Sequence, residues 1–204
     1  MSPARPKDRP DQILAAARAA ILQHGVADVR VADIAREANV STAAVHYHFD
    51  AKQDVIVAAF RWSSERLFEE IEARLAACST VAHRLACLLE ISVPQSGLLR
   101  DEYVIWIQFW ARVLSDPGLL PECEAVSARW RGYFEAVVAD GCASGEFTPV
   151  APAQEVADRL LALIDGMGFE TVIGYRWATV ERMRERLWRF AGEQLGAQLP
   201  RWDA

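Results

Sequence analysis

The stretch ANVSTAAVHYHFDAKQDV, from Ala38 to Val55, places a tyrosine between two histidines and follows them with a phenylalanine and a lysine. Three interpretations compete: a metal site, a catalytic histidine pair, or a surface helix that contacts something charged. On a helix His46 and His48 point roughly 200° apart, because each residue turns the chain by about 100°. They therefore cannot chelate one metal ion, and no recognisable motif places a nucleophile or a carboxylate beside them.

Composition and length indicate an ordinary globular protein. Of the 204 residues, 52% are hydrophobic and 25% are charged, which is the usual balance for a soluble domain. No apolar run approaches the ~20 residues that span a bilayer, and the N-terminus lacks the apolar core of a signal peptide. The four cysteines are widely spaced without a CxxC, which favours buried, reduced thiols over disulfides or zinc. We expect a cytoplasmic protein with no cofactor, no metal and no membrane contact.

Charge is distributed unevenly along the chain. Residues 1–52 hold 7 Lys/Arg against 6 Asp/Glu, whereas residues 53–204 hold 15 against 22, within a total net charge of −6. An acidic body with a neutral-to-basic end fits a protein that contacts a polyanion through that end only. Arg5, Lys7 and Arg9 are either a disordered end or an arm that lies along DNA.

Helical periodicity covers nearly the whole chain and predicts an all-α fold. Gly25 and Asn39 suit the left-handed conformation that ends a helix, Ser41 or Thr42 can cap the third helix, and Thr179 can cap the last. Residues 141–152 are expected to form a loop. The helices are expected over residues 11–24, 31–38, 42–49, 51–75, 81–93, 101–115, 120–141, 152–174 and 180–195.

Short helices, tight turns and a long fourth helix make a helix-turn-helix arrangement. The segment from Ile13 to Val55 resembles the DNA-binding domain of the TetR family of transcriptional regulators, through DIAREANVSTAAVHYHFDAKQDV. The segments DGCASGEF and LLALIDGMG resemble the ligand-binding domain of the BetI-like, choline-sensing branch. The resemblance implies a helix-turn-helix domain over residues 1–52, joined by a long helix to a ligand-binding and dimerisation domain over residues 53–204.

The chain departs from the usual family pattern at four positions. Arg30 stands where Ser or Thr usually caps the second helix, and Asn39 stands where Gly is usual. His46 replaces the first aromatic residue of the Tyr-x-His-Phe string. Ala51 replaces a small polar cap, so Asp50 is expected to cap the fourth helix one residue early.

The third helix is predicted to enter a groove of DNA. Small Ala43 and Ala44 side chains allow close approach to base edges, and Arg30 and Lys52 offer charges to phosphates, which fix register rather than sequence. Val45 and Phe49 are four residues apart and should anchor the helix to the core. The predicted DNA-contacting residues are Arg30, Ser41, Thr42, Ala43, His46, Tyr47, His48 and Lys52.

Aromatic residues concentrate in the C-terminal half. Core packing alone accounts for any one ring, whereas the family resemblance implies an aromatic-lined ligand cavity, and both can hold. Ring faces attract cations, and no arginine cluster is interleaved with the rings. This pattern favours a cationic or amphipathic amine, or a flat hydrophobic molecule, over a phosphorylated metabolite. The predicted ligand-binding residues are Trp106, Phe109, Trp110, Trp130 and Phe169.

The last two predicted helices carry more apolar residues than one core face needs, which predicts a four-helix dimer interface. Its predicted residues are Leu160, Leu161, Ile164, Val172, Met183, Leu187 and Phe190. The function predicted is a homodimeric regulator, most often a repressor in this family, that a small effector releases from a pseudo-palindromic operator in double-stranded DNA. An all-helical enzyme and a helical adaptor that does not bind DNA are the alternatives.

Overall fold

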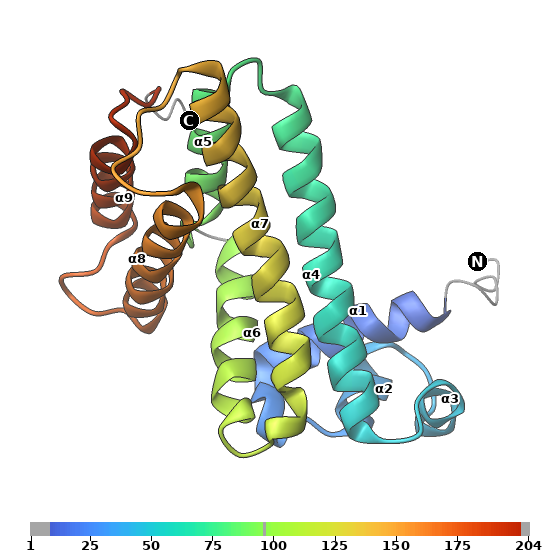
Figure 1. The fold of residues 1–204 in the computed structure, drawn as a ribbon. Coiled ribbons are helices and arrows are strands. Elements are labelled where there is room, and N and C mark those ends of the chain that lie inside the picture. The colour runs from blue at the N-terminus through green and yellow to red at the C-terminus, as the bar shows by residue number, and fades with distance from the viewer. Residues whose placement is uncertain (1–8, 96, 201–204) are drawn as a thin grey trace. The chain divides into compact units, whose positions relative to one another are not determined.

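The computed structural model of the chain describes residues 9–95 and 97–200, and within them it contains helices and no strand, as predicted (Figure 1). Most helices begin and end within three residues of the predicted positions. In chain order they are α1 (Arg9–Asp28), α2 (Val31–Glu37), α3 (Thr42–His48), α4 (Lys52–Ala77), α5 (Val81–Ile91), α6 (Leu98–Val113), the 3-10 helix η1 (Pro117–Leu119), α7 (Leu120–Ser144), α8 (Ala153–Ile173) and α9 (Val180–Leu195).

One expected helix end and one expected helix cap are wrong. Helix α7 continues through Ser144, although a loop was expected from Gly141. A Cβ on Gly141 would lie only 2.0 Å from the ring of Phe147, so only glycine lets the phenylalanine pack on the helix at this position. Asp50 does not cap α4; the carboxylate of Asp54 instead accepts a hydrogen bond from the amide of Ala51 at 2.8 Å.

The first of two compact units holds the described residues up to Leu67 together with Val104–Glu124. In it α2 packs on both α1 and α3, and buried apolar side chains such as Ile34, Val45 and Val55 form its core. The unit therefore includes most of α6, which the predicted division at residue 52 assigned to the other domain.

The second unit holds Phe68–Tyr103 and the described residues from Ala125 onward. Within it α8 packs along α9, and α9 packs on α5. The fully buried carboxylate of Glu90 on α5 accepts two hydrogen bonds from Arg184 on α9, at 3.0 and 2.8 Å, and a third from Gln95. A charge this deeply buried needs such partners, so the pair fixes α9 against α5.

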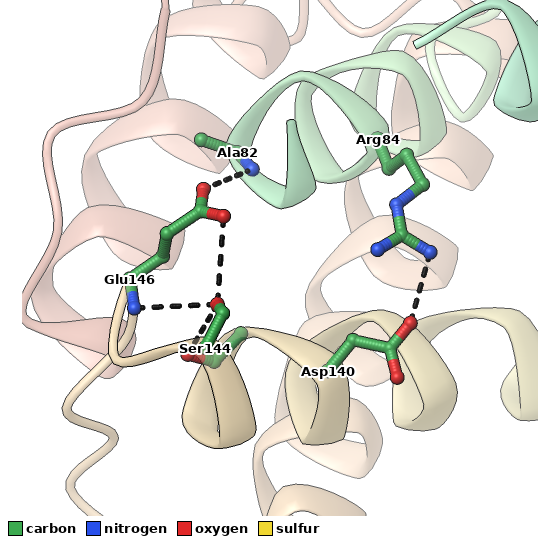
Figure 2. A network of polar contacts seen from close by, with 6 residues as sticks. Ala82, Arg84, Asp140, Ser144 and Glu146 are labelled. Carbon is green, nitrogen blue, oxygen red and sulfur yellow. Dashed lines mark hydrogen bonds and ion pairs between the residues drawn. The ribbon is translucent and has the colours of Figure 1, made fainter. Parts of the chain in front are cut away.

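A second polar network joins the start of α5 to the end of α7 (Figure 2). Arg84 donates to Asp140 at 2.9 Å, and the backbone N–H of Ala82 donates to the carboxylate of Glu146 at 3.2 Å. The hydroxyl of Ser144 accepts from the Glu146 amide. A carboxylate at the first turn satisfies an N–H that the helix itself leaves open.

The described residues bear on three expectations from composition: the state of the cysteines, metal binding and membrane-spanning helices. The four cysteines are free thiols, but only Cys123 is buried, and Cys142 is exposed. In the described ranges, no three His, Cys, Asp or Glu side chains gather closely enough to hold a metal ion. No described helix is both long and apolar enough to cross a bilayer.

Candidate DNA-contacting surface and ligand site

The turn between α2 and α3 is built by Asn39. Its φ of 53° is the left-handed conformation, which asparagine tolerates better than other residues with a side chain. The amide of Asn39 donates to the carbonyl of Arg36 at 3.1 Å, and the amide of Val40 donates to Ala35 at 2.9 Å. This pair of bonds is the Schellman ending of a helix, so Asn39 fills the position that glycine usually takes.

Helix α3 is capped, anchored on one side and open on the other. The hydroxyl of Ser41 accepts the amide of Ala44 at 3.1 Å, which confirms the predicted cap. Val45 is fully buried and holds the helix to the unit, whereas Tyr47 is 85% exposed. The ring of Tyr47 meets the ring of His48 at 5.1 Å between centroids and otherwise faces solvent, so it is available to a partner. Ser41, Thr42, Ala43, His46 and Tyr47 share this exposed face, and His48 is half-buried.

The two predicted phosphate ligands differ in their surroundings. Arg30 is exposed at the start of α2, where its backbone amide donates to Asp33 at 3.1 Å. Lys52, at the start of α4, donates from its ammonium to the carbonyl of Ala27 at 2.8 Å. An ammonium has three protons, so Lys52 can keep this bond and still contact a phosphate. Of the predicted basic arm, Arg5, Lys7 and the side chain of Arg9 lie outside the described residues.

Four rings, which we name the aromatic cluster, gather on α4 and α6 in the first unit: Phe60, Trp106, Phe109 and Trp110. Phe60 stacks on Phe109 with centroids 4.1 Å apart, and it meets the edge of Trp106 at 5.1 Å. Trp106 in turn meets Trp110 at 5.7 Å. Phe60 and Phe109 have no appreciable exposed surface, whereas Trp106 and Trp110 are half-buried. The two tryptophans are therefore the rings of this cluster that can offer surface to a ligand without rearrangement.

Helix α6 also bonds directly to the N-terminal helices. The side-chain oxygen of Gln108 accepts the amide of Val26, just after the kink of α1 at Gly25, at 2.7 Å. Just beyond the C-terminal end of α6, Asp116 accepts a hydrogen bond from Gln53 of α4 at 3.2 Å. A displacement of α6 would therefore disturb both α1 and the start of α4.

The other two predicted ligand residues belong to the second unit. Trp130 on α7 is half-buried and packs edge-on against Phe134 at 5.3 Å. Phe169 is 40% exposed on α8. Near it, the carboxylate of Asp165 is half-buried, and this burial raises its pKa from the ordinary value of 3.8 to about 6. The hydroxyl of Tyr103 donates to the carbonyl of Ser92 at 2.8 Å.

The prediction for the dimer interface is partly wrong. Leu160, Ile164, Met183 and Leu187 are at most 1% exposed, because α8 and α9 bury them inside the same chain. They hold the two helices together and are not available to a partner. Leu161, Val172 and Phe190 keep some exposed surface, and their contact with a partner stays a prediction.

A different stripe of α8 faces outward. Ala162, Gly166, Phe169 and Ile173 recur every three or four residues on its exposed side, and the loop after α8 adds Trp177. Phe169, Ile173 and Trp177 are 40%, 51% and 55% exposed. Several large apolar side chains exposed on one side of a helix are typical of an interaction surface. We name these five residues the α8 stripe.

Three residues of the candidate sites were missed by sequence reasoning alone. Phe60, Ser64 and Gln108 gave no signal beyond ordinary helical spacing. Phe60 has the spacing of an ordinary core residue on α4, and Gln108 is a polar residue within an otherwise apolar stretch of α6. Their roles depend on which helices pack together.

Two family profiles match the chain. "Bacterial regulatory proteins, tetR family" covers residues 13–59, and "BetI-type transcriptional repressor, C-terminal" covers residues 81–196. A regulator named BetI from Serratia proteamaculans is 30% identical over 170 residues, 81% of each chain. BetI from Cronobacter sakazakii is 28% identical over 195 residues, with 93% of this chain and 92% of that one covered.

Solved structures agree with these relatives. A transcriptional regulator from Saccharomonospora viridis, crystallised in complex with choline, is 33% identical, with a TM-score of 0.86 over 93% of this chain and 98% of that one. A TetR transcription regulator from Haloarcula marismortui is 26% identical, with a TM-score of 0.81 over 93% and 99% of the two chains.

Proposed function

We propose that this chain, which belongs to the BetI-type branch of the TetR family of transcriptional regulators, is a homodimeric cytoplasmic repressor that a cationic amine releases from its operator. The observation that carries the DNA-binding part is the build of α3. Ser41 caps it, Val45 anchors it, and its outer face presents Tyr47 almost fully to solvent. A short, anchored helix with an open outer face is suited to insertion into a major groove.

On DNA the residues of this surface take different roles. Arg30 and Lys52 flank α3 and neutralise phosphates, which sets the position of the helix on the duplex. The small Ala43 allows the helix to approach base edges, and His46 and Tyr47 contact them. Two copies related by a two-fold axis read a pseudo-palindrome whose half-sites lie roughly 34–36 Å apart.

Footprinting tests this part of the proposal. The protein is mixed with the DNA that flanks its own gene, and the protected bases are mapped. The proposal expects two protected half-sites on one face of the duplex, with centres about one helical turn or a multiple of it apart. A Tyr47→Ala variant should lose this protection. Absence of any protected site in DNA from the gene's own flanks would count against an autoregulating repressor.

The second copy is proposed to bind at the α8 stripe. Its small residues, Ala162 and Gly166, allow two helices to approach closely, while Phe169, Ile173 and Trp177 supply apolar area. The exposed face of α9 is charged instead, with Glu181, Arg182, Glu185, Arg186, Arg189 and Glu193. An isologous interface places the same stripe on both subunits, so α8 would cross its own copy near the two-fold axis.

The effector is proposed to be a quaternary or amphipathic amine such as choline. The choline-bound regulator from Saccharomonospora viridis supports this class, as does the pair of half-buried indoles, Trp106 and Trp110. A cation over an indole face gains about 0.5–2 kcal/mol, depending on how dry the site is. Titration of the protein with choline should change tryptophan emission. Emission that no amine changes, at any concentration up to the millimolar range, would contradict this effector class.

Release from DNA is proposed to pass through α6. This helix carries Trp106 and Trp110 as well as Gln108, whose side chain accepts the Val26 amide. A ligand that wedges against the indoles would displace α6, strain this bond, and disfavour the arrangement of α1 and α4 that DNA requires. Moving the protein from 99% to 1% in the DNA-binding state needs about 5.5 kcal/mol of differential affinity, which dry aromatic and polar contacts have to supply together.

A further inference from the structure

Ser64, midway along α4, has an unusual hydroxyl. The residue is 2% exposed, and its Oγ has no hydrogen-bond partner among the described residues. Buried hydroxyls on helices normally donate to the carbonyl four residues earlier, as Ser92 does to Leu88 at 2.7 Å and Thr171 does to Met167 at 2.8 Å. A buried hydroxyl without a bond destabilises the fold, so the hydroxyl calls for a partner that the described residues do not supply.

The neighbourhood of this hydroxyl points to the kind of partner. Ser64 lies four residues after Phe60, so the two side chains share the buried face of α4. Phe60 belongs to the aromatic cluster, where it touches both Phe109 and Trp106. Ser64, whose hydroxyl can still form a hydrogen bond, therefore lies one helical turn, about 5.4 Å, from Phe60 of the aromatic cluster. A ligand with a cationic head against the indoles and a polar group a few atoms away matches both features.

We propose that Ser64 is a specificity-determining residue that hydrogen-bonds a hydroxyl carried by the effector and so selects an amino alcohol over an alkyl ammonium of the same size. A serine hydroxyl both donates and accepts, which suits a neutral hydroxyl partner. This inference rests on the proposed cationic effector. It adds that the site also recognises a hydroxyl group at the end of the ligand opposite the cation. A site that hydrogen-bonds a ligand hydroxyl rejects the analogue that lacks it, because its own polar group is then left unpaired.

The test compares two cations that differ only in this group. Choline and n-propyltrimethylammonium have the same charge and nearly the same volume, but the second carries a methyl group in place of the hydroxyl. Dissociation constants are measured by calorimetry and by tryptophan emission. The parent protein should bind choline roughly tenfold more tightly, which is the usual worth of one buried hydrogen bond. In Ser64→Ala this preference should vanish, through loss of choline affinity, while the affinity for n-propyltrimethylammonium is kept.

Ser63→Ala is the matched control. Ser63 is also buried on α4, but its hydroxyl accepts a hydrogen bond from Arg18 at 2.9 Å. Its removal should leave the preference for choline intact. A second readout is independent of any ligand: Ser64→Ala should raise the melting temperature of the ligand-free protein, since it deletes an unpaired polar group, whereas Ser63→Ala should lower it.

The outcomes separate the two proposals. If both cations bind the parent and Ser64→Ala keeps the tenfold preference, the role of Ser64 is overturned and the cationic effector stands. If the parent binds both cations equally, the protein does not recognise the hydroxyl of choline, and the inference also fails. If neither cation binds the parent, the effector class itself is wrong and the role of Ser64 falls with it.

Discussion

Replacing Asp165 by asparagine should stabilise the folded protein at neutral pH. The carboxylate is half-buried on α8, and among the described residues no cation pairs with it, so burial raises its pKa from 3.8 to about 6. A tenfold change in proton affinity corresponds to about 1.4 kcal/mol. Ionising Asp165 in the folded chain therefore costs on the order of 3 kcal/mol once the pH exceeds the folded pKa.

The direction of the pH dependence follows from the raised pKa. Below about pH 4 the carboxyl group is protonated in both the folded and the unfolded chain, and its ionisation costs nothing. Between about pH 4 and pH 6 the unfolded chain releases the proton more readily, so the folded state loses stability as the pH rises. Above about pH 6 the loss is complete. Asparagine does not titrate, so the gain of Asp165→Asn should grow over this same range.

Urea unfolding followed by circular dichroism measures this gain at pH 4.5 and at pH 7.5. We expect a free energy of unfolding about 2–3 kcal/mol higher for the variant at pH 7.5, and a much smaller difference at pH 4.5. Asp158→Asn is the control, because Asp158 lies on the same helix, is exposed and pairs with Arg131. A gain that is equal at both pH values, or larger at the lower one, would refute the burial argument.

Three further predictions concern binding and assembly. Lys52→Ala should weaken binding to all DNA sequences and reduce the slope of affinity against salt by about one, as measured by anisotropy titrations at several salt concentrations. Ile173→Glu should convert the dimer to a monomer in light scattering, whereas Arg186→Glu on the charged face of α9 should leave the mass unchanged; a dimeric Ile173→Glu would exclude the α8 stripe. Gln108→Ala leaves the Val26 amide without its acceptor, so DNA affinity should fall by about five- to tenfold. Choline affinity should rise, because the ligand no longer has to strain this bond.

The helix-turn-helix unit was predictable because its signals are local. Asn39 ends one helix through its tolerance of positive φ, and Ser41 begins the next through one side-chain bond, so neither depends on distant parts of the chain. The α8 and α9 helices were predicted for the same reason, since Thr179 caps α9 as expected.

The sites were harder to predict because they depend on packing. Apolar spacing predicts that Ile164 and Leu187 are buried, but it cannot tell whether the same chain or a second copy buries them. In the structure α8 and α9 of the same chain pack together and bury both residues. Lys52 could be recognised as a charge beside the recognition helix, but not as a donor to Ala27. That the Ser64 hydroxyl has no hydrogen-bond partner among the described residues becomes clear only when the positions of the neighbouring acceptors are known.

The central claim is that an amine bound at the aromatic cluster lowers the affinity for DNA, and one anisotropy experiment tests it. A labelled DNA fragment from the flank of the chain's own gene is saturated with protein, and choline is added. The account predicts that anisotropy falls to that of free DNA over the same choline range that changes tryptophan emission, and that bound DNA weakens choline binding by the same factor. Choline that saturates the emission change while the DNA stays bound would contradict the claim.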